Sequence, residues 1–340
     1  MKTIAVTCGD AAGIGPELVA RALALPPSEW GARLAVRGGE NLLRRAAQHA
    51  GLAWPEGVAV VAPGEAWPET GHVIVSDAAD VALDSITPGR VQAVCGERAH
   101  AWICGAVDDL RAGRAHALAT APVNKFALRM AGVDFPGHTE LLAHLAGVPE
   151  DGVRMMFWSA RLRVVLETIH APLAEVPRML SRAHLAQTLR MAAAAAGPRV
   201  GVLALNPHAG EGGLFGREES DVLAPAIAGA RAEGLDVSGP LVPDTAFCWI
   251  GRGEDSPFDA WVAMYHDQGL IPFKMAAFHE GVNVTLGLPF ARTSPDHGTA
   301  FDLAWQGRAD PGSFFAALRL AVKTFQPQSR IGNQPGLCVR

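Results

Sequence analysis

The sequence predicts an α/β protein with a largely parallel β-sheet. Short aliphatic runs alternate with longer amphipathic segments along the whole chain, which is the pattern of repeated strand–helix units. The runs lack the alternation of apolar and polar residues, as expected of strands that helices cover on both faces. Hydrophobic residues make up 49% of the 340 positions and charged residues 19%, so the chain can bury a large core.

The aliphatic runs are predicted to be the strands of this sheet. Each is four to six residues long, and all but the run at 155–158, Met-Met-Phe-Trp, are rich in Val, Ile, Leu and Ala, which suits buried strands. The predicted strands are residues 3–7, 34–37, 58–61, 72–76, 117–121, 155–158, 163–168, 200–205 and 261–265.

Helix starts are marked by proline just after a residue that can cap a helix. Such pairs occur at 15–16, 87–88 and 310–311, and the last of them begins a helix that runs to about residue 325. Ser181 is predicted to cap an alanine-rich helix that residues 197–198, Gly-Pro, end.

Composition excludes several classes of protein. Lys and Arg number 29 against 34 Asp and Glu, a net charge of −5, so nucleic acid is not an expected partner. The aliphatic runs are far shorter than the ~20 residues of a membrane span, and the N-terminal residues lack the apolar region of a signal peptide. Five cysteines without C-x-x-C spacing indicate neither a disulfide framework nor a cysteine zinc site. We therefore expect a cytoplasmic protein with no membrane partner.

Domain boundaries are not visible in the composition, because there is no internal repeat and no long low-complexity linker. We expect one catalytic unit over residues 1–325. Residues 326–340 are rich in Gln, Pro and Gly and are predicted to be a loosely held C-terminal tail.

Twelve histidines accompany a single tyrosine, and three of them share one context. His170, His208 and His266 each lie just past the end of an aliphatic run, where ligands bind in open α/β sheets. Neutral imidazole is the commonest metal ligand in proteins, and three histidines with an open position are typical of a catalytic metal site. Asp267 is a candidate to orient a histidine or to join the coordination shell. The alternative is that each histidine only hydrogen-bonds a loop.

Other turns are candidate anion or cofactor sites. Residues 9–17, Gly-Asp-Ala-Ala-Gly-Ile-Gly-Pro-Glu, follow the first strand and offer backbone N–H groups at a helix start. The segment is neither a complete dinucleotide fingerprint nor a P-loop, and a plain tight turn explains it equally well. His138 and Thr139 stand at another helix start, where phosphate or carboxylate can bind, or where Thr139 is an ordinary N-cap. Residues 297–304 are predicted to be a loop that enters a helix.

Three further polar residues lie along the segment after His266. Lys274, Asn283 and Arg292 are individually typical surface residues, but together they are the groups that an acidic, phosphorylated substrate needs.

Seven motifs together resemble the 4-hydroxythreonine-4-phosphate dehydrogenase (PdxA) family of pyridoxal phosphate biosynthesis, from about residue 3 to 325. The departures are small: Cys8 and Ala11 stand where the family often has proline, and His279 and Glu280 occupy a variable position. The motifs are Gly-Asp-x-Ala-Gly-Ile-Gly-Pro-Glu at 9–17, Thr-Ala-Pro-Val-Asn-Lys at 120–125, Gly-His-Thr-Glu at 137–140, Asn-Pro-His-Ala-Gly-Glu-Gly-Gly at 206–213, His-Asp-Gln-Gly at 266–269, Gly-Val-Asn-Val-Thr-Leu-Gly-Leu-Pro at 281–289 and Arg-Thr-Ser-Pro-Asp-His-Gly-Thr-Ala at 292–300.

The resemblance implies a fold similar to the isocitrate and isopropylmalate dehydrogenases, with two α/β/α lobes, a central cleft and a homodimer whose active site draws on both subunits. It also implies a divalent metal (Zn, Mg or Co) and NAD, with NADP open as the alternative. The implied metal ligands are His170, His208 and His266; the substrate contacts are His138, Thr139, Lys274, Asn283 and Arg292; and the cofactor contacts are His297, Gly298, Thr299 and Asp302.

The implied reaction is NAD-linked oxidation of the C3 hydroxyl of 4-phosphooxy-L-threonine, followed by decarboxylation to 3-amino-2-oxopropyl phosphate. Lys274 and Asp267 are candidate proton acceptors, with Asp244 a third. Two alternatives stay open within the family, a four-carbon sugar-acid phosphate or a dihydrodiol carboxylate as substrate. Outside it, a three-histidine site also describes a metal-dependent hydrolase or a non-catalytic metal-binding module.

Overall fold

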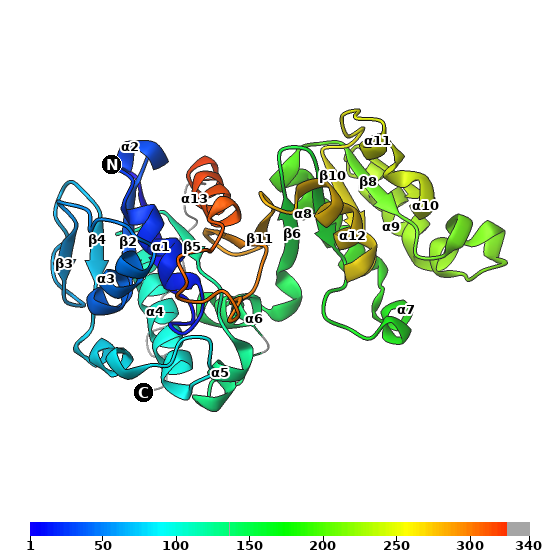
Figure 1. Ribbon diagram of the computed structural model, residues 1–340. Helices are drawn as coiled ribbons and strands as arrows, with labels where there is room; N and C mark the ends of the chain where they lie inside the picture. Colours follow the sequence, from blue (N-terminus) through cyan, green and yellow to red (C-terminus); the bar gives the residue numbers. More distant parts are fainter. Residues whose placement is uncertain (136, 325–340) are drawn as a thin grey trace. The chain divides into compact units, whose positions relative to one another are not determined.

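The computed structural model describes residues 1–135 and 137–324, so the predicted tail at 326–340 lies outside the described residues. The chain forms two compact units (Figure 1). Unit 1 combines Met1–Glu150 with the chain from Leu288 onward, and unit 2 is the continuous segment Asp151–Gly287. The first boundary falls within a 3₁₀ turn, Glu150–Gly152, and the second falls between Gly287 and Leu288. Neither boundary is marked by a change in composition.

Unit 1 is built on a parallel sheet. Its strands are β1 (Thr3–Thr7), β2 (Arg33–Arg37), β3 (Ala59–Val61), β4 (Val73–Val75), β5 (Ala117–Thr120) and β12 (Ala291–Pro295), in the order β3-β4-β2-β1-β5-β12. Its helices are α1 (Gly15–Leu23), α2 (Pro27–Trp30), α3 (Glu40–His49), α4 (Ala93–Arg111), α5 (Lys125–Met130), α6 (His138–Ala146) and α13 (Gly312–Lys323), with a 3₁₀ helix at Ala78–Ser85.

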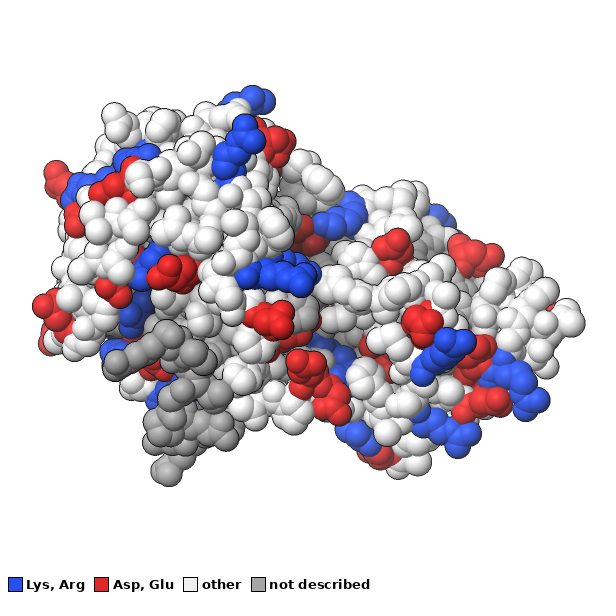
Figure 2. All heavy atoms as spheres, turned by 90° about the horizontal axis from the view of Figure 1, so that it is seen from below, with Lys and Arg blue, Asp and Glu red and all other residues white. Residues whose placement is uncertain are grey.

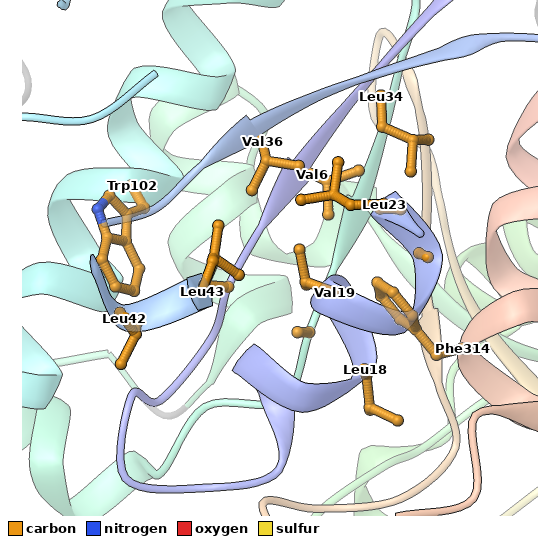
Figure 3. Close-up of a cluster of buried hydrophobic side chains, with 14 of the residues drawn as sticks. Val6, Leu18, Val19, Leu23, Leu34, Val36, Leu42, Leu43, Trp102 and Phe314 are labelled. Atoms are coloured by element: carbon orange, nitrogen blue, oxygen red, sulfur yellow. The ribbon is translucent and has the colours of Figure 1, made fainter. Parts of the chain in front are cut away.

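The core of unit 1 lies on both faces of this sheet, because successive strand residues point to opposite sides. Val6 and Leu34 pack with residues of α1, α3 and α13, among them Phe314 (Figure 3). Ala5 and Leu118 belong to a second cluster with residues of α4 and α6. The strands are therefore apolar on both faces, and this explains the absence of polar alternation in the sequence.

Unit 2 has a mixed sheet. Strands β7 (Arg163–Leu166), β10 (Ala260–Ala263), β8 (Val200–Leu203) and β9 (Val237–Leu241) are parallel neighbours in that order, and β6 (Arg154–Trp158) is antiparallel to both β7 and β11 (Val282–Leu286). Its helices are α7 (Val176–Met179), α8 (Arg182–Ala196), α9 (Ala224–Ala232), α10 (Pro243–Ala246), α11 (Cys248–Gly251) and α12 (His266–Ala277), with a 3₁₀ turn at Leu173–Glu175 and a π turn at Glu219–Leu223. Phe273 of α12 packs on Val164 and Trp261 of the sheet.

The predicted α/β class is confirmed, and every predicted strand is present within one or two residues of its expected ends. Strands β9, β11 and β12 were not predicted. Strand β9 contains Gly239 and Pro240 and pairs only at the edge of the sheet, where proline is tolerated. Strands β11 and β12 carry buried polar residues, including Arg292 and Thr293, so they lack the aliphatic pattern of a strand.

Helix starts were predicted with mixed success. Ser181 caps α8, because its hydroxyl accepts a hydrogen bond from the His184 N–H at 3.2 Å. The predicted start at 87–88 was wrong: α4 begins at Ala93, and Gly89 has a left-handed φ of 70° that a helix cannot contain. Gly137, not Thr139, is the N-cap of α6, and no helix follows the loop at 297–304 until Gly312.

No helix in the described part of the chain is long and apolar enough to cross a membrane. On the face shown in Figure 2, acidic and basic side chains are intermixed among uncharged residues. This intermixing of acidic and basic side chains is consistent with the small net charge of −5.

Candidate active site

Three histidines of unit 2 follow three neighbouring strands. His170 lies shortly after β7, His266 is the first residue of α12 directly after β10, and His208 lies in the loop after β8. Because β7, β10 and β8 are parallel neighbours, their carboxyl ends meet at one edge of the sheet. This is the edge at which α/β proteins bind ligands.

The structure brings His170 and His266 together. Their ring centroids are 5.9 Å apart, and both rings line a cavity of about 290 Å³ with Tyr265 and Asp267. Asp267 Oδ1 accepts a hydrogen bond from His266 Nδ1 at 2.7 Å. Such a carboxylate fixes the tautomer and the orientation of a metal-binding imidazole and leaves Nε2 available as a ligand.

His208 sits on a loop with unusual backbone geometry. Residues from His208 to Gly212 all have positive φ, with values of 54° at His208, 54° at Ala209 and 42° at Glu211. Non-glycine residues adopt this region at a cost that surrounding contacts must offset. Glu219 holds the chain just before this loop, because its carboxylate accepts hydrogen bonds from the N–H groups of Leu205 and Asn206 at 2.9 and 2.7 Å.

The His208 side chain is 64% exposed and lines a second cavity of about 570 Å³. This cavity also touches Tyr265 and Asp267, as the first one does. Within the described part of a single chain, no three His, Cys, Asp or Glu side chains are close enough to hold a metal ion together. The chain thus offers a pair of imidazoles suited to a divalent ion, while the third predicted ligand stands apart from the pair.

A second polar cluster lies in unit 1 at the start of α6. Arg292 is 2% exposed and donates from Nη2 to the Thr120 hydroxyl at 2.7 Å. Burial lowers the pKa of Arg292 to about 10. Burial and the positive charges of Arg292 and Lys125 hold the pKa of His138 well below its ordinary value, so its imidazole is neutral at pH 7. Nε2 of His138 is buried and has no hydrogen-bond partner among the described residues.

Lys125 is a member of this cluster that the sequence reasoning did not select. It is the first residue of α5, and its side chain lies beside Gly137, where a Cβ would sit 3.4 Å from the Lys125 Cε. The motif at 120–125 contained the signal, because it places a cation directly after a buried strand. The cluster combines an exposed ammonium, a buried guanidinium and helix N–H groups, which together suit an anion.

Thr139, the second residue of α6, is buried in unit 1, whereas the two remaining predicted substrate contacts belong to unit 2. Lys274 lies on α12, with its ammonium 5.8 Å from the ring centroid of Phe278. Asn283 lies on β11, and its Oδ1 is buried without a hydrogen-bond partner among the described residues. Polar atoms of this kind are rare in folded proteins and often mark a ligand site.

The predicted cofactor loop packs on the first glycine-rich turn within unit 1. The Ile14 N–H donates to the carbonyl of Thr299 at 3.0 Å, and a Cβ on Gly13 would lie 2.9 Å from that carbonyl oxygen. Glycine is therefore required at position 13 by this close approach. His297 Nε2 is buried and unpartnered among the described residues. This nitrogen can donate or accept one hydrogen bond from a ligand.

Asp10, in the same turn, is 1% exposed, with Oδ1 accepting from the Ala12 N–H at 2.9 Å and Oδ2 buried. Burial raises its pKa to about 6 from an ordinary 3.8. The folded protein therefore holds this proton more tightly than the unfolded chain, and stability is lost as the pH rises from about 4 to 6.

We expect Asp10→Asn to remove this loss. The unfolding free energy of the variant relative to the parent should rise by about 2.4 kcal/mol between pH 4 and pH 7. Urea denaturation of both proteins at several pH values measures the difference in unfolding free energy. The contributions of all other titrating groups are the same in the two proteins and cancel in this difference. Parallel profiles would contradict the burial of an ionising carboxyl at this position.

Comparisons with known proteins find relatives of one family that match nearly the entire chain. A family model described as "Pyridoxal phosphate biosynthetic protein PdxA" matches residues 30–321. A 4-hydroxythreonine-4-phosphate dehydrogenase of Geobacter metallireducens is 42% identical, over 98% of this chain and 98% of its own. A D-threonate 4-phosphate dehydrogenase of Salmonella typhimurium is also 42% identical, over 95% of this chain and 98% of its own.

A solved structure also resembles this chain over nearly its whole length. A 4-hydroxythreonine-4-phosphate dehydrogenase from Klebsiella pneumoniae superposes with a TM-score of 0.81 at 40% identity, covering 96% of this chain and 100% of the other. The two clusters described above are therefore parts of an architecture that known dehydrogenases share.

Proposed function

Because the chain belongs to the family of pyridoxal phosphate biosynthetic protein PdxA, we propose that it oxidises 4-phosphooxy-L-threonine with NAD and releases carbon dioxide to give 3-amino-2-oxopropyl phosphate. The chain is a dehydrogenase of that family, which implies a nicotinamide cofactor and a small phosphorylated substrate. The observation that best supports the proposal is the cationic cluster at the start of α6, where Arg292, Lys125 and His138 meet.

The cluster binds and orients the anionic groups of the substrate in this proposal. A phosphate or carboxylate there receives charge-assisted hydrogen bonds, which are about twice as strong as neutral ones. The neutral imidazole of His138 donates through its buried Nε2 or accepts from the substrate. Thr139, buried at the second position of α6, adds a hydroxyl and a free backbone N–H.

His170, His208 and His266 are the residues that would hold a divalent ion, and the loop at 297–302 would hold NAD. When bound, the ion supplies Lewis acidity toward the substrate hydroxyl and the nicotinamide accepts hydride. Asp267 orients His266 through the hydrogen bond at 2.7 Å, so its carboxylate is committed to that ring. We therefore assign the role of proton acceptor to Lys274 and an orienting role to Asp267.

A second substrate has specific support. The D-threonate 4-phosphate dehydrogenase of Salmonella typhimurium is as similar to this chain as the 4-hydroxythreonine-4-phosphate dehydrogenase of Geobacter metallireducens, at 42% identity each. The two substrates differ in the amine of one and the hydroxyl of the other, while both carry a phosphate and a carboxylate. Contacts to phosphate and carboxylate therefore do not discriminate between them.

The protein acts as a homodimer in this proposal. The side chains of Ile271, Met275 and Phe278 are 61%, 81% and 67% exposed, and their spacing places them on one side of α12. Exposed apolar stripes of this kind mark protein interfaces. Ile271 and Met275 line the same cavity as His208, so a second copy seated on this stripe reaches the metal-ligand region.

The reaction is tested with the full-length protein, NAD, a divalent metal and a panel of substrates, by following NADH absorbance. We expect turnover of 4-phosphooxy-L-threonine that a chelator abolishes. Faster turnover of D-threonate 4-phosphate or of a dihydrodiol carboxylate would replace the proposed substrate, and a preference for NADP would replace the cofactor. Release of phosphate without NADH formation would instead identify a metal-dependent hydrolase.

A further inference from the structure

Two side chains connect the strand ends that carry the three histidines. Thr168 donates from its hydroxyl to the Met264 carbonyl at 2.7 Å. Gln268 accepts from the Met264 N–H at 2.7 Å and donates from its amide nitrogen to the Ala204 carbonyl at 2.7 Å. The chain after β7 is thereby linked to the chain after β10, and the chain after β10 to that after β8.

These bonds occur where the regular sheet pairing stops. The last paired residues are Ala263 with Leu166, and Val262 with Val202. Beyond these positions two backbone bonds still join the chain after β7 to β10 and the residue after it, from the Glu167 N–H to the Ala263 carbonyl at 2.8 Å and from the Thr168 N–H to the Met264 carbonyl at 3.3 Å. The Thr168 hydroxyl adds a second hydrogen bond to the Met264 carbonyl, and the Gln268 amide joins the chain after β10 to the chain after β8.

The bonded backbone groups lie very close to the histidines in sequence. Thr168 precedes His170 by two residues, and Met264 precedes His266 by two. Ala204 lies at the start of the short segment that leads to His208, in which Glu219 accepts hydrogen bonds from the N–H groups of Leu205 and Asn206. These backbone groups therefore help to fix the positions of the nearby histidines.

Only a glutamine satisfies both groups at position 268. Its carbonyl accepts from Met264 and its amide donates to Ala204, while a glutamate of the same size can only accept when ionised. The side chain is partly buried between the two strand ends. Losing either bond leaves a backbone group between the strand ends without its partner, which is unfavourable.

We propose that Thr168 and Gln268 are positioning residues for metal binding, and that together they fix the segment that leads to His266, Thr168 against the chain that leads to His170 and Gln268 against the chain after β8. The inference rests on the proposed role of the three histidines as metal ligands. Sites of this kind tolerate displacements of only about 0.5 Å. Loss of residues that support metal ligands typically lowers metal affinity by about 10- to 100-fold.

The test compares two isosteric glutamine-to-methionine variants in the full-length protein. Gln268→Met removes both bonds near the histidines. Gln92→Met is the matched control in unit 1, where Gln92 likewise accepts from the Thr87 N–H at 3.1 Å and donates to the Thr87 carbonyl at 2.9 Å. Affinity for Co²⁺ is measured by competition with a chromophoric chelator, together with the rise in Tm that Co²⁺ causes and the visible absorption of the bound ion.

We expect Gln268→Met to weaken Co²⁺ binding by about 10- to 100-fold and to reduce the Tm increment, with Gln92→Met within twofold of the parent. The milder variants Gln268→Glu and Thr168→Val should shift the affinity in the same direction, and they keep the test decisive if Gln268→Met does not fold. Equal affinities for the Gln268 and Gln92 variants would overturn the inference alone. Absence of Co²⁺ binding by the parent, or binding that His266→Ala leaves unchanged, would overturn both the inference and the proposed metal site.

Discussion

The His208→Ala variant is expected to lose metal-dependent NADH formation, by at least about 1,000-fold in kcat, because a catalytic ion with one of three ligands removed is neither held nor oriented. The side chain is 64% exposed on a loop, so its removal should change the unfolding free energy by no more than about 1 kcal/mol. Steady-state kinetics with and without added metal, beside urea denaturation, measure both quantities.

A surface histidine in unit 1 provides the control. His49 contacts the ring of Trp305 with centroids 5.3 Å apart and has no place in the proposed site, so His49→Ala should keep full activity. Full activity of His208→Ala without added metal would rule out a three-histidine site.

The same variant also tests whether the site is shared between subunits. If a dimer combines His208 of one chain with the His170–His266 pair of the other, mixing His208→Ala with His266→Ala rebuilds one intact site in each mixed dimer. Random exchange of subunits should then restore about one quarter of the parent activity. If all three ligands belong to one chain, the mixture stays inactive.

Arg292→Met is expected to lower kcat/KM for the phosphorylated substrate by about 100-fold or more, since a buried guanidinium that binds an anion contributes several kcal/mol. The substitution should not lower the unfolding free energy. Burial lowers the pKa of Arg292 from 12.5 to about 10, which means that folding disfavours its charge at every pH below about 10. Removing the charge removes that penalty, so the unfolding free energy should stay the same or rise.

Arg37→Met is the informative comparison. Arg37 is also buried, but it donates two hydrogen bonds to the Asp109 carboxylate, at 2.7 and 2.6 Å. Removing one partner of a buried ion pair costs about 3–5 kcal/mol, and Arg114 also binds Asp109, so we expect a loss near the lower end. Catalytic constants should be unchanged. Loss of stability in Arg292→Met with unchanged kinetics would reverse its assignment from substrate binding to structure.

The strands that were predicted from the sequence are those whose side chains are apolar on both faces. Val6 and Ala5 of β1 face different clusters, and that double burial leaves a continuous aliphatic run. Strands β11 and β12 were missed for the opposite reason. Asn283 and Arg292 stand inside them as candidate ligand contacts, so the residues proposed for function are the ones that interrupt the strand pattern.

The candidate site was predictable as far as strand ends could be located. His170 and His266 lie together because β7 and β10 are neighbours, although that adjacency is a property of the topology and not of the sequence pattern. The position of His208 was not predictable, because His208, Ala209 and Glu211 adopt a left-handed backbone that residues of these types rarely adopt. Lys125 was overlooked because its partner Gly137 lies in another motif.

The division of the chain also determines the order in which its parts become complete during synthesis. Unit 2 is continuous and ends at Gly287, whereas unit 1 needs the chain after Leu288. The Arg292–Thr120 hydrogen bond spans 172 residues, and Phe314 enters the unit 1 core only with α13. When the ribosome has released residue 287, unit 2 has all its strands while the sheet of unit 1 still exposes the edge of β5. The half of the protein that is translated first is therefore the last to finish folding, and its unpaired edge strand is the segment on which we expect chaperones to act.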